Sequence, residues 1–210
     1  MNKELFIAKI SDNEDPDKLH RVKITFKILE ETVSEWVPVI SSFTGNDSGF
    51  FSLPDIDEQV LVAHIDNSTI PYCVIGSLWS NEIKPPASDE NSDADFNQDG
   101  NNSLHFIKSR AGNKIIFDDT DSKEKIQIIS ADNTSRLEFS AEDELINLET
   151  ENDIQFSAKG NIQLNAEEIS IESSNETNIS SESFQINSSK ELNINADKDI
   201  TIKGSGIALN

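Results

Sequence analysis

The stretch that decides the fold is residues 154–202, IQFSAKGNIQLNAEEISIESSNETNISSESFQINSSKELNINADKDITI. Apolar residues recur in it as pairs two positions apart, and a new pair begins every seven or eight residues. Residues two apart lie on the same side of an extended chain, so each pair predicts a short strand with one buried side. The Ser, Asn, Asp, Glu and Lys residues between the pairs suit turns and solvated surface.

The same pairing reaches back to Leu104 and forward to Ile207/Leu209. The pair starts lie 11, 11, 11, 9, 8, 8, 7, 8, 7, 8, 8 and 7 residues apart, with Thr177 in the place of an apolar residue before Ile179. A disordered tail is the alternative that the polar composition favours, but it does not explain the regular spacing. A strand every eight residues is too short for a meander of hairpins and indicates a chain that winds around an axis.

Two apolar residues per strand are too few to fill the interior of a single-chain solenoid. Three chains intertwined about a threefold axis would supply one strand each per layer, and thirteen layers at about 4.8 Å give a rod of roughly 60 Å. We therefore expect a C-terminal intertwined triple-stranded β-helix, a trimeric needle. The residues expected in the trimer core are Ile154, Phe156, Ile162, Leu164, Ile169, Ile171, Ile179, Phe184, Ile186, Leu192, Ile194, Ile200 and Ile202.

The N-terminal part predicts a second all-β domain. All six prolines lie before residue 87, and their absence afterwards permits one long β structure in the remainder of the chain. Short apolar runs separated by turn residues predict an OB-type barrel or a sandwich. These runs are RVKITFKI (21–28), EWVPVIS (35–41), FFSLP (50–54), QVLVAHI (59–65) and YCVIGSL (72–78). The expected organisation is a barrel over residues 1–83, an acidic linker over 84–103 and the β-helical needle over 104–210.

The charge balance excludes whole classes of function. The chain has 39 acidic and 17 basic residues, a net charge of −22, and residues 1–103 carry 19 acidic against 7 basic residues. Such a chain is unsuited to nucleic acid, whose binding depends on Lys and Arg, or to anionic lipid surfaces. Its single cysteine, Cys73, allows no internal disulfide. The N-terminus lacks the apolar core of a signal peptide, so we expect synthesis and folding in the cytoplasm.

Candidate chemistry is sparse, and we expect neither an enzyme nor a bound cofactor. His20, His64 and His105 lie in separate segments without metal-ligand spacing. We expect Cys73 to be a small buried apolar residue. DFNQDG (95–100) matches the first half of a calcium loop, with Asp95, Asn97 and Asp99 as oxygen ligands. The twelfth position of that loop is Phe106 instead of Glu, which favours a solvated acidic linker and leaves calcium binding open.

The order of several motifs resembles the central spikes of contractile injection machines, the phage baseplate assembly protein V and the C-terminal half of the type VI secretion spike VgrG. The matching segments differ from the family pattern at His20 and Asp57, where these spikes usually have glycine. The segments are DPDKLHRVKITF (15–26), WVPV (36–39), SGFFSLPDIDEQVLVAHID (48–66), IPYCVIGSLWS (70–80) and SRAGNKIIFDDTDSKEKIQIIS (109–130).

The resemblance implies a homotrimeric spike in the baseplate of a phage tail, a secretion system or an extracellular injection particle. Its barrel would attach to a baseplate hub protein, and sheath contraction would drive the needle mechanically through the target membrane. A tail-fibre-like trimer that binds carbohydrate is the alternative. The chain has no histidine after His105 for a metal-binding apex, so we expect a PAAR-like tip protein to cover the blunt end. The residues expected to bind that protein are Gly204, Gly206, Ile207, Leu209 and Asn210.

Overall fold

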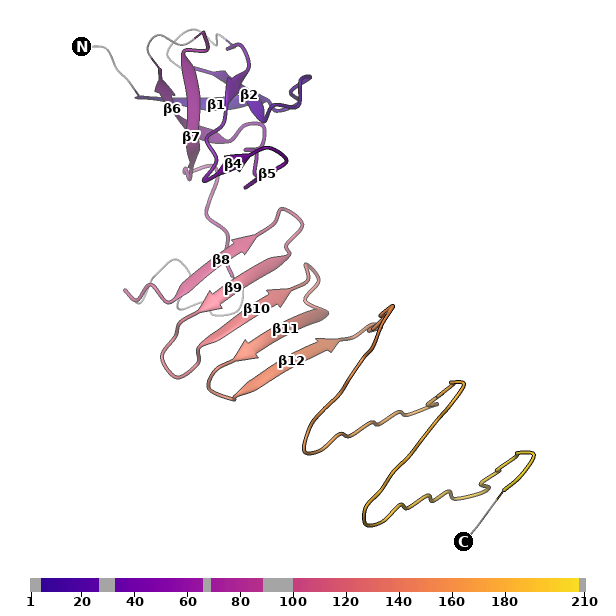
Figure 1. The fold of residues 1–210 in the computed structure, drawn as a ribbon. Helices are drawn as coiled ribbons and strands as arrows, with labels where there is room; N and C mark the ends of the chain where they lie inside the picture. The colour runs from indigo at the N-terminus through magenta and orange to yellow at the C-terminus, as the bar shows by residue number, and fades with distance from the viewer. Residues whose placement is uncertain (1–4, 27–32, 66–68, 89–99, 208–210) are drawn as a thin grey trace. The chain divides into compact units, whose positions relative to one another are not determined.

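The computed structural model describes residues 5–26, 33–65, 69–88 and 100–207. Every regular element in these residues is a β-strand, so the all-β expectation is confirmed. The chain divides into two compact units, residues 1–155 and residues 156–210. The first unit holds a small barrel and a separate five-stranded sheet (Figure 1).

The barrel is built on a five-stranded antiparallel sheet in the order β3-β2-β1-β6-β7. Alternate residues of its long strands point inward, which is why the sequence alternates between apolar and polar residues in β2 and β6. A small hairpin of β4 and β5 lies between β3 and β6 in the sequence. The strands are β1 (Leu5–Asp12), β2 (Arg21–Thr25), β3 (Val37–Pro38), β4 (Thr44–Gly45), β5 (Ser48–Gly49), β6 (Gln59–His64) and β7 (Tyr72–Leu78).

The two edges of this sheet meet and close the barrel. Val39 forms a parallel bridge with Val74, and the amide of Ile40 donates to the carbonyl oxygen of Val74 at 2.9 Å. This closure, together with the strand order, is the topology of a five-stranded OB-type barrel. The enclosed core consists of Ala8, Ile10, Val22, Ile24, Phe26, Val37, Val60, Val62 and Val74.

Two parts of the barrel differ from the expectation. β1 was not expected, because LFIAKI (5–10) is apolar at almost every position and shows no clean alternation. The strand expected over residues 50–54 is not present in the structure. Pro54 has no amide hydrogen for a ladder, and the preceding residues instead join the β4–β5 hairpin, where the amide of Phe50 donates to the carbonyl oxygen of Phe43 at 3.2 Å.

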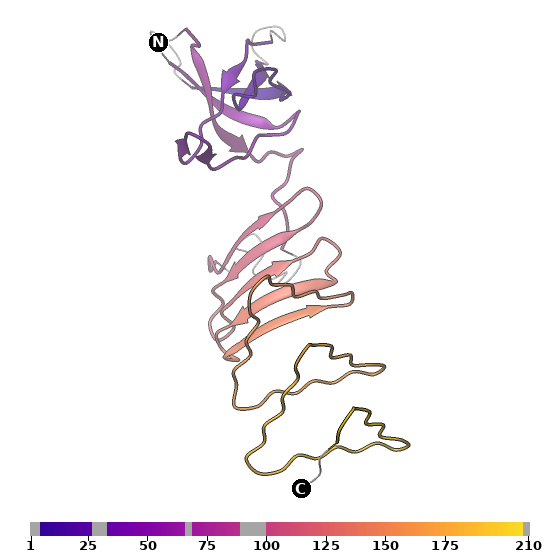
Figure 2. The same ribbon diagram turned by 45° about the vertical axis from the view of Figure 1, so that its right-hand side comes forward.

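The second sheet of the first unit is an antiparallel meander. Its strands follow one another in space as they do in sequence, from β8 to β12 (Figure 2). Short turns join consecutive strands. Such turns suffice because neighbouring strands run antiparallel. The strands are β8 (Leu104–Lys108), β9 (Lys114–Asp118), β10 (Lys125–Ile129), β11 (Ser135–Ser140) and β12 (Leu145–Thr150).

The meander corrects the expectation that residues 104–210 form one winding structure. The pair starts from Leu104 to Ile146 lie 9 to 11 residues apart, which accommodates a strand of five or six residues and a turn that reverses the chain. The later steps of seven or eight residues are too short for this. The chain therefore changes its mode of folding after Thr150, and the change of spacing in the sequence marks the place.

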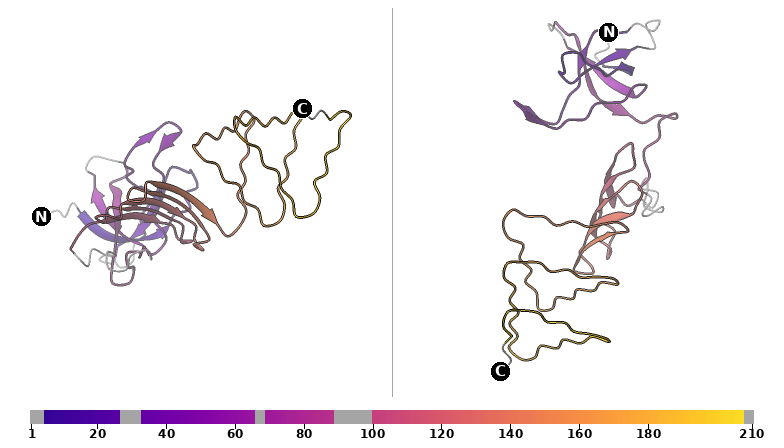
Figure 3. Two further views of the ribbon diagram at one scale, coloured as in Figure 1. Left: turned by 90° about the horizontal axis from the view of Figure 1, so that it is seen from below. Right: turned by 90° about the vertical axis from the view of Figure 1, so that its right-hand side faces the viewer.

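The second unit winds in successive open turns with straight segments between its bends (Figure 3). Over the described residues 156–207 it forms no ladder with any other part of the same chain. The straight segments between residues 161 and 204 each carry one of the apolar pairs identified in the sequence, except the segment that holds Thr177 and Ile179. The β-helix itself stays a prediction. The bends lie at residues 159–160, 167, 174–175, 182, 189–190, 197–198 and 205.

Candidate assembly surface

One face of the β8–β12 meander is an uncovered apolar surface. Cross-strand pairing places ten of its side chains in two rows across the five strands. Nine of the ten are apolar, and His105 is the exception. The first row is Ile107, Ile115, Ile128, Leu137 and Leu148, and the second is His105, Phe117, Ile126, Phe139 and Ile146. We call these ten residues the two-row face.

The two-row face is exposed in the single chain. Ile107 is 65% exposed and Ile146 is 68% exposed, whereas isoleucines of the barrel core are fully buried. An open hollow of about 530 Å³ follows the first row, and a second of about 430 Å³ follows the second row. Half of the residues that line each hollow are apolar, and they include most of the corresponding row, as expected of a surface that packs against other apolar side chains.

The sequence analysis assigned the wrong pair to the first strand of this face. It grouped Leu104 and Phe106 with the later pairs, but Leu104 lies opposite Asp118 and Phe106 lies opposite Ile116. Both therefore point to the other side of the sheet, and His105 and Ile107 take their places on the two-row face. A shift of one residue reverses the face of every side chain in a strand, and the turn over residues 109–113 sets that register.

The opposite face of the sheet carries both apolar and polar side chains and is covered, with Ile116 and Ile129 buried on it. The Lys114 ammonium donates to the carbonyl oxygen of Ser88 at 3.0 Å, and the Lys108 ammonium donates to that of Ala87 at 3.0 Å. Ser88 and Gln127 have no exposed surface. The chain that leaves the barrel thus lies over this side of the sheet, whereas the two-row face has no such cover in the single chain.

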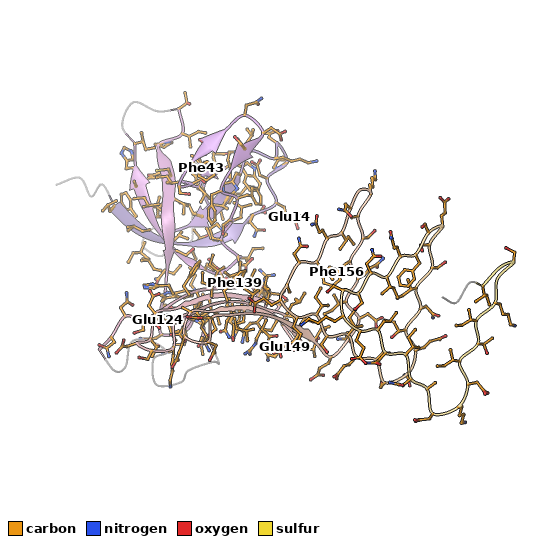
Figure 4. The ribbon with its side chains drawn as sticks, turned by 60° about the horizontal axis from the view of Figure 1, so that its bottom comes forward. Glu14, Phe43, Glu124, Phe139, Glu149 and Phe156 are labelled. Atoms are coloured by element: carbon orange, nitrogen blue, oxygen red, sulfur yellow. The ribbon has the colours of Figure 1, made fainter. Side chains whose placement is uncertain are left out.

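The winding segment exposes its apolar pairs even more fully. Phe156 is 74% exposed and Ile171 is 76% exposed. Figure 4 shows the side chains of this segment, Phe156 among them, standing away from the backbone with no layer of protein over them. Apolar side chains without a core are unfavourable in water, so this segment exposes a surface suited to packing against other apolar side chains.

The residues expected in the trimer core all lie on this winding segment or just before it. Each is exposed in the single chain, from Ile154 at 47% to Ile171 at 76%. Their burial between chains stays a prediction. Of the residues expected at the blunt end, Gly204, Gly206 and Ile207 are exposed, and Leu209 and Asn210 lie outside the described residues.

The candidate chemical groups do not converge. His20 lies against Phe51, with 4.6 Å between ring centroids, and His64 lies against Tyr72 at 5.5 Å, while His105 is on the two-row face. Within the described ranges no group of His, Cys, Asp or Glu side chains could hold a metal ion. The possible calcium ligands Asp95, Asn97 and Asp99 lie outside those ranges. None of the described residues forms a helix that is long and apolar enough to cross a membrane.

The acidic turn before β2 binds an arginine. The Arg21 guanidinium donates to both carboxylate oxygens of Asp15, at 2.9 and 2.6 Å, and to Asp17 at 2.7 Å. The Asp15 carboxylate also accepts from the amides of Leu19 and Asp17. Hydrogen bonds from Arg21, and then from these amides, hold the pKa of Asp15 well below its usual range. The group is structural: it fixes the turn that leads into the barrel.

A comparison with known families identifies the barrel. Residues 6–79 match the family model of the type VI secretion system/phage-baseplate injector OB domain. This segment is an injector OB domain. The match confirms, over residues 6–79, the resemblance that the motifs of the N-terminal part indicated. No curated protein matches the sequence significantly.

The injector OB domain explains both departures from the glycine pattern. His20 has φ of 60° and Asp57 has φ of 71°, so both take the left-handed conformation that glycine adopts most readily. The backbone of this chain therefore keeps the turn for which the related spikes use glycine. The two imidazole nitrogens of His20 are buried and have no hydrogen-bond partner in the described residues. The sequence motif thus located His20 and Asp57 as departures from glycine, and the structure shows that both positions need a positive φ.

Proposed function

We propose that the chain is the central spike of a contractile injection particle, and that three copies intertwine to form it. The injector OB domains attach the spike to a baseplate hub protein. The winding segments form a triple-stranded β-helical needle, and sheath contraction drives this needle through the target membrane. The spike acts mechanically and carries out no catalysis.

The observation that carries this proposal is the winding segment. It is ordered into regular turns although no strand of the same chain pairs with it in the described residues 156–207 and its apolar pairs are exposed. A chain whose successive turns form no ladder with one another can instead pair with strands of other chains. With identical chains, each apolar pair then meets its equivalents around a shared axis.

The two-row face supports the same assembly. The sheet is covered on one side, and the two-row face is the apolar surface that it leaves open. Three such faces directed toward one axis would bury nine apolar residues per chain, and at about 25 cal/mol per Å² this burial is a strong driving force. The face lies between the barrel and the winding segment in the sequence, and its burial in the trimer is part of the same proposal.

The function can be tested in the particle that contains the chain. Ile171→Asp places three carboxylates against the trimer axis, where each costs several kcal/mol unless it is compensated. We expect particles with this variant to lack an assembled needle and to fail to penetrate target cells. Ser170→Asp is the matched control, because Ser170 lies between Ile169 and Ile171 and points outward. If Ile171→Asp particles injected as well as Ser170→Asp particles, the proposed role would be wrong.

We further propose that a PAAR-like protein covers the blunt end. Gly204 and Gly206 precede Ile207, so three chains would present exposed apolar side chains at the end of the needle. A cap would remove that surface from water. Truncation after Gly204 should release the cap from purified particles while the rest of the spike stays in place. Full retention of the cap by the truncated spike would exclude this binding site.

A further inference from the structure

Thr177 occupies a unique position in the winding segment. The straight stretch between the bends at residues 174–175 and 182 holds Thr177 and Ile179 in the two places that are apolar in the other complete stretches from Ile154 to Ile202. Residues two apart lie on one side of an extended chain, so Thr177 shares the side of Ile179. The alternation is visible in the next stretch, where Gln185 donates to Asn187 at 3.4 Å on the side away from Phe184 and Ile186.

We propose that Thr177 sets the register of the three chains, an inference that rests on the proposed trimeric needle. In register, three Thr177 hydroxyls meet in one layer, where each can donate to another and accept from a third. If one chain slips by one stretch, each hydroxyl that leaves this layer faces apolar side chains without a partner. A buried polar group without a partner is costly, so the slipped assembly is disfavoured.

The winding segment needs such a device because its stretches are alike. The pairs repeat every seven or eight residues, so a slip by one stretch again places apolar pairs against apolar pairs. Repetitive strands specify their register weakly. The layers of Phe156 and Phe184 differ from the others only in the size of the apolar side chain. Neighbouring side chains can partly adjust to that difference in size, so it penalises a slipped register only weakly. A single polar residue in an apolar seam is a known way of fixing register at a cost in stability.

Thr177→Val tests the inference because it removes the hydroxyl and keeps the shape. We expect the thermal midpoint of the trimer to rise by at least about 2 °C, since a buried polar layer is lost. We also expect a smaller fraction of denatured chains to refold into one protease-resistant trimer, since slipped trimers are no longer excluded. Thr201→Val is the matched control, because Thr201 lies between Ile200 and Ile202 and points outward. It should change neither quantity.

Three results would overturn the inference. If Thr177→Val behaved like Thr201→Val, Thr177 would not face the core. If the midpoint rose while the refolded fraction stayed at the wild-type level, the residue would be buried without setting the register. If the midpoint fell, the hydroxyls would contribute to stability instead of selecting the register. These outcomes are separate from a failure of the proposed function, which a monomeric wild-type chain would reveal.

Discussion

Asp57 shows how a single backbone angle links this chain to related spikes. Its φ of 71° lies in the left-handed region, and its side chain is exposed. We expect Asp57→Gly to raise the free energy of unfolding of the barrel by about 0.5–1 kcal/mol, because glycine removes the strain of a left-handed side chain. Urea unfolding followed by tryptophan fluorescence measures this directly, since Trp36 and Trp79 both lie in the N-terminal part.

Glu14→Gly is the matched control for that variant. Glu14 is an exposed acidic residue of the same domain with an ordinary φ (labelled in Figure 4). Glycine there only increases the entropy of the unfolded chain, so the barrel should lose about 0.5–1 kcal/mol. Equal effects of the two substitutions would mean that the left-handed backbone at Asp57 carries no strain.

The Asp15–Arg21 pair predicts how the barrel responds to acid. The pKa of Asp15 is lowered in the folded protein, chiefly by the hydrogen bonds from Arg21, so the unfolded chain takes up the proton first as the pH falls. Its contribution to stability is therefore complete above the ordinary carboxyl pKa of about 3.9 and is lost as the pH falls below it.

Asp15→Asn should lower the stability of the barrel at pH 7 and flatten the loss of stability between about pH 4 and pH 2. Asp17→Asn provides the comparison, because the Asp17 side chain is 66% exposed and contacts Arg21 only from the outside. Urea midpoints across this pH range, again by tryptophan fluorescence, give the result. An unchanged acid slope in Asp15→Asn would show that another carboxylate controls acid unfolding.

At the scale of elements, the sequence predicted periodicity better than it predicted topology. The spacing of apolar pairs located the straight stretches of the winding segment. Residues two apart lie on the same side of any extended chain, so this pattern can be recognised without knowledge of the topology. The meander was missed, although its turns carry a local signal. The backbone carbonyl oxygen of Ser109 accepts a hydrogen bond from the amide of Gly112, and that of Ser130 accepts one from the amide of Asn133. Gly112 and Asn133 both have a positive φ. Serine followed by such a residue predicts a hairpin turn.

The two-row face was predictable only in part for a related reason. Its pairs from Ile115 to Leu148 were recognised, but the register of β8 depends on the turn before β9 and not on the composition of β8 itself. The cover over the opposite side could not be predicted, because the contacts of Lys108 and Lys114 with Ala87 and Ser88 join segments more than 20 residues apart. Both contacts are made to backbone carbonyl oxygens, which every residue has, so the residue types at these positions do not reveal them.

His105 offers a test of the two-row face. It is the one polar member of the ten, next to Phe117 on the neighbouring strand. If the face is buried between chains, His105→Leu should stabilise the assembly by at least about 1 kcal/mol per chain, because it completes an apolar row. His105→Gln should give no such gain. Thermal unfolding of the assembled protein compares the two variants, and equal midpoints would indicate that the face remains in water.

At the scale of the whole molecule, charge and burial act together. The net charge of −22 is carried by a chain whose apolar residues in the winding segment lie on one side and whose acidic residues lie between them. Assembly would bury the apolar side and leave the acidic side in water, where repulsion between spikes keeps them soluble. The proposed trimer would also account for the low hydrophobic fraction of 35%, because each chain would then contribute only a third of the core.

The mass of the purified full-length chain in solution tests the central claim most directly. The account predicts a single species of about 70 kDa by light scattering, three times the chain mass of 23.3 kDa, which persists in denaturant because the chains are interwound. A folded, monodisperse species of 23.3 kDa would contradict it, because the two-row face and the apolar pairs of the winding segment would then be stable in water without a partner chain.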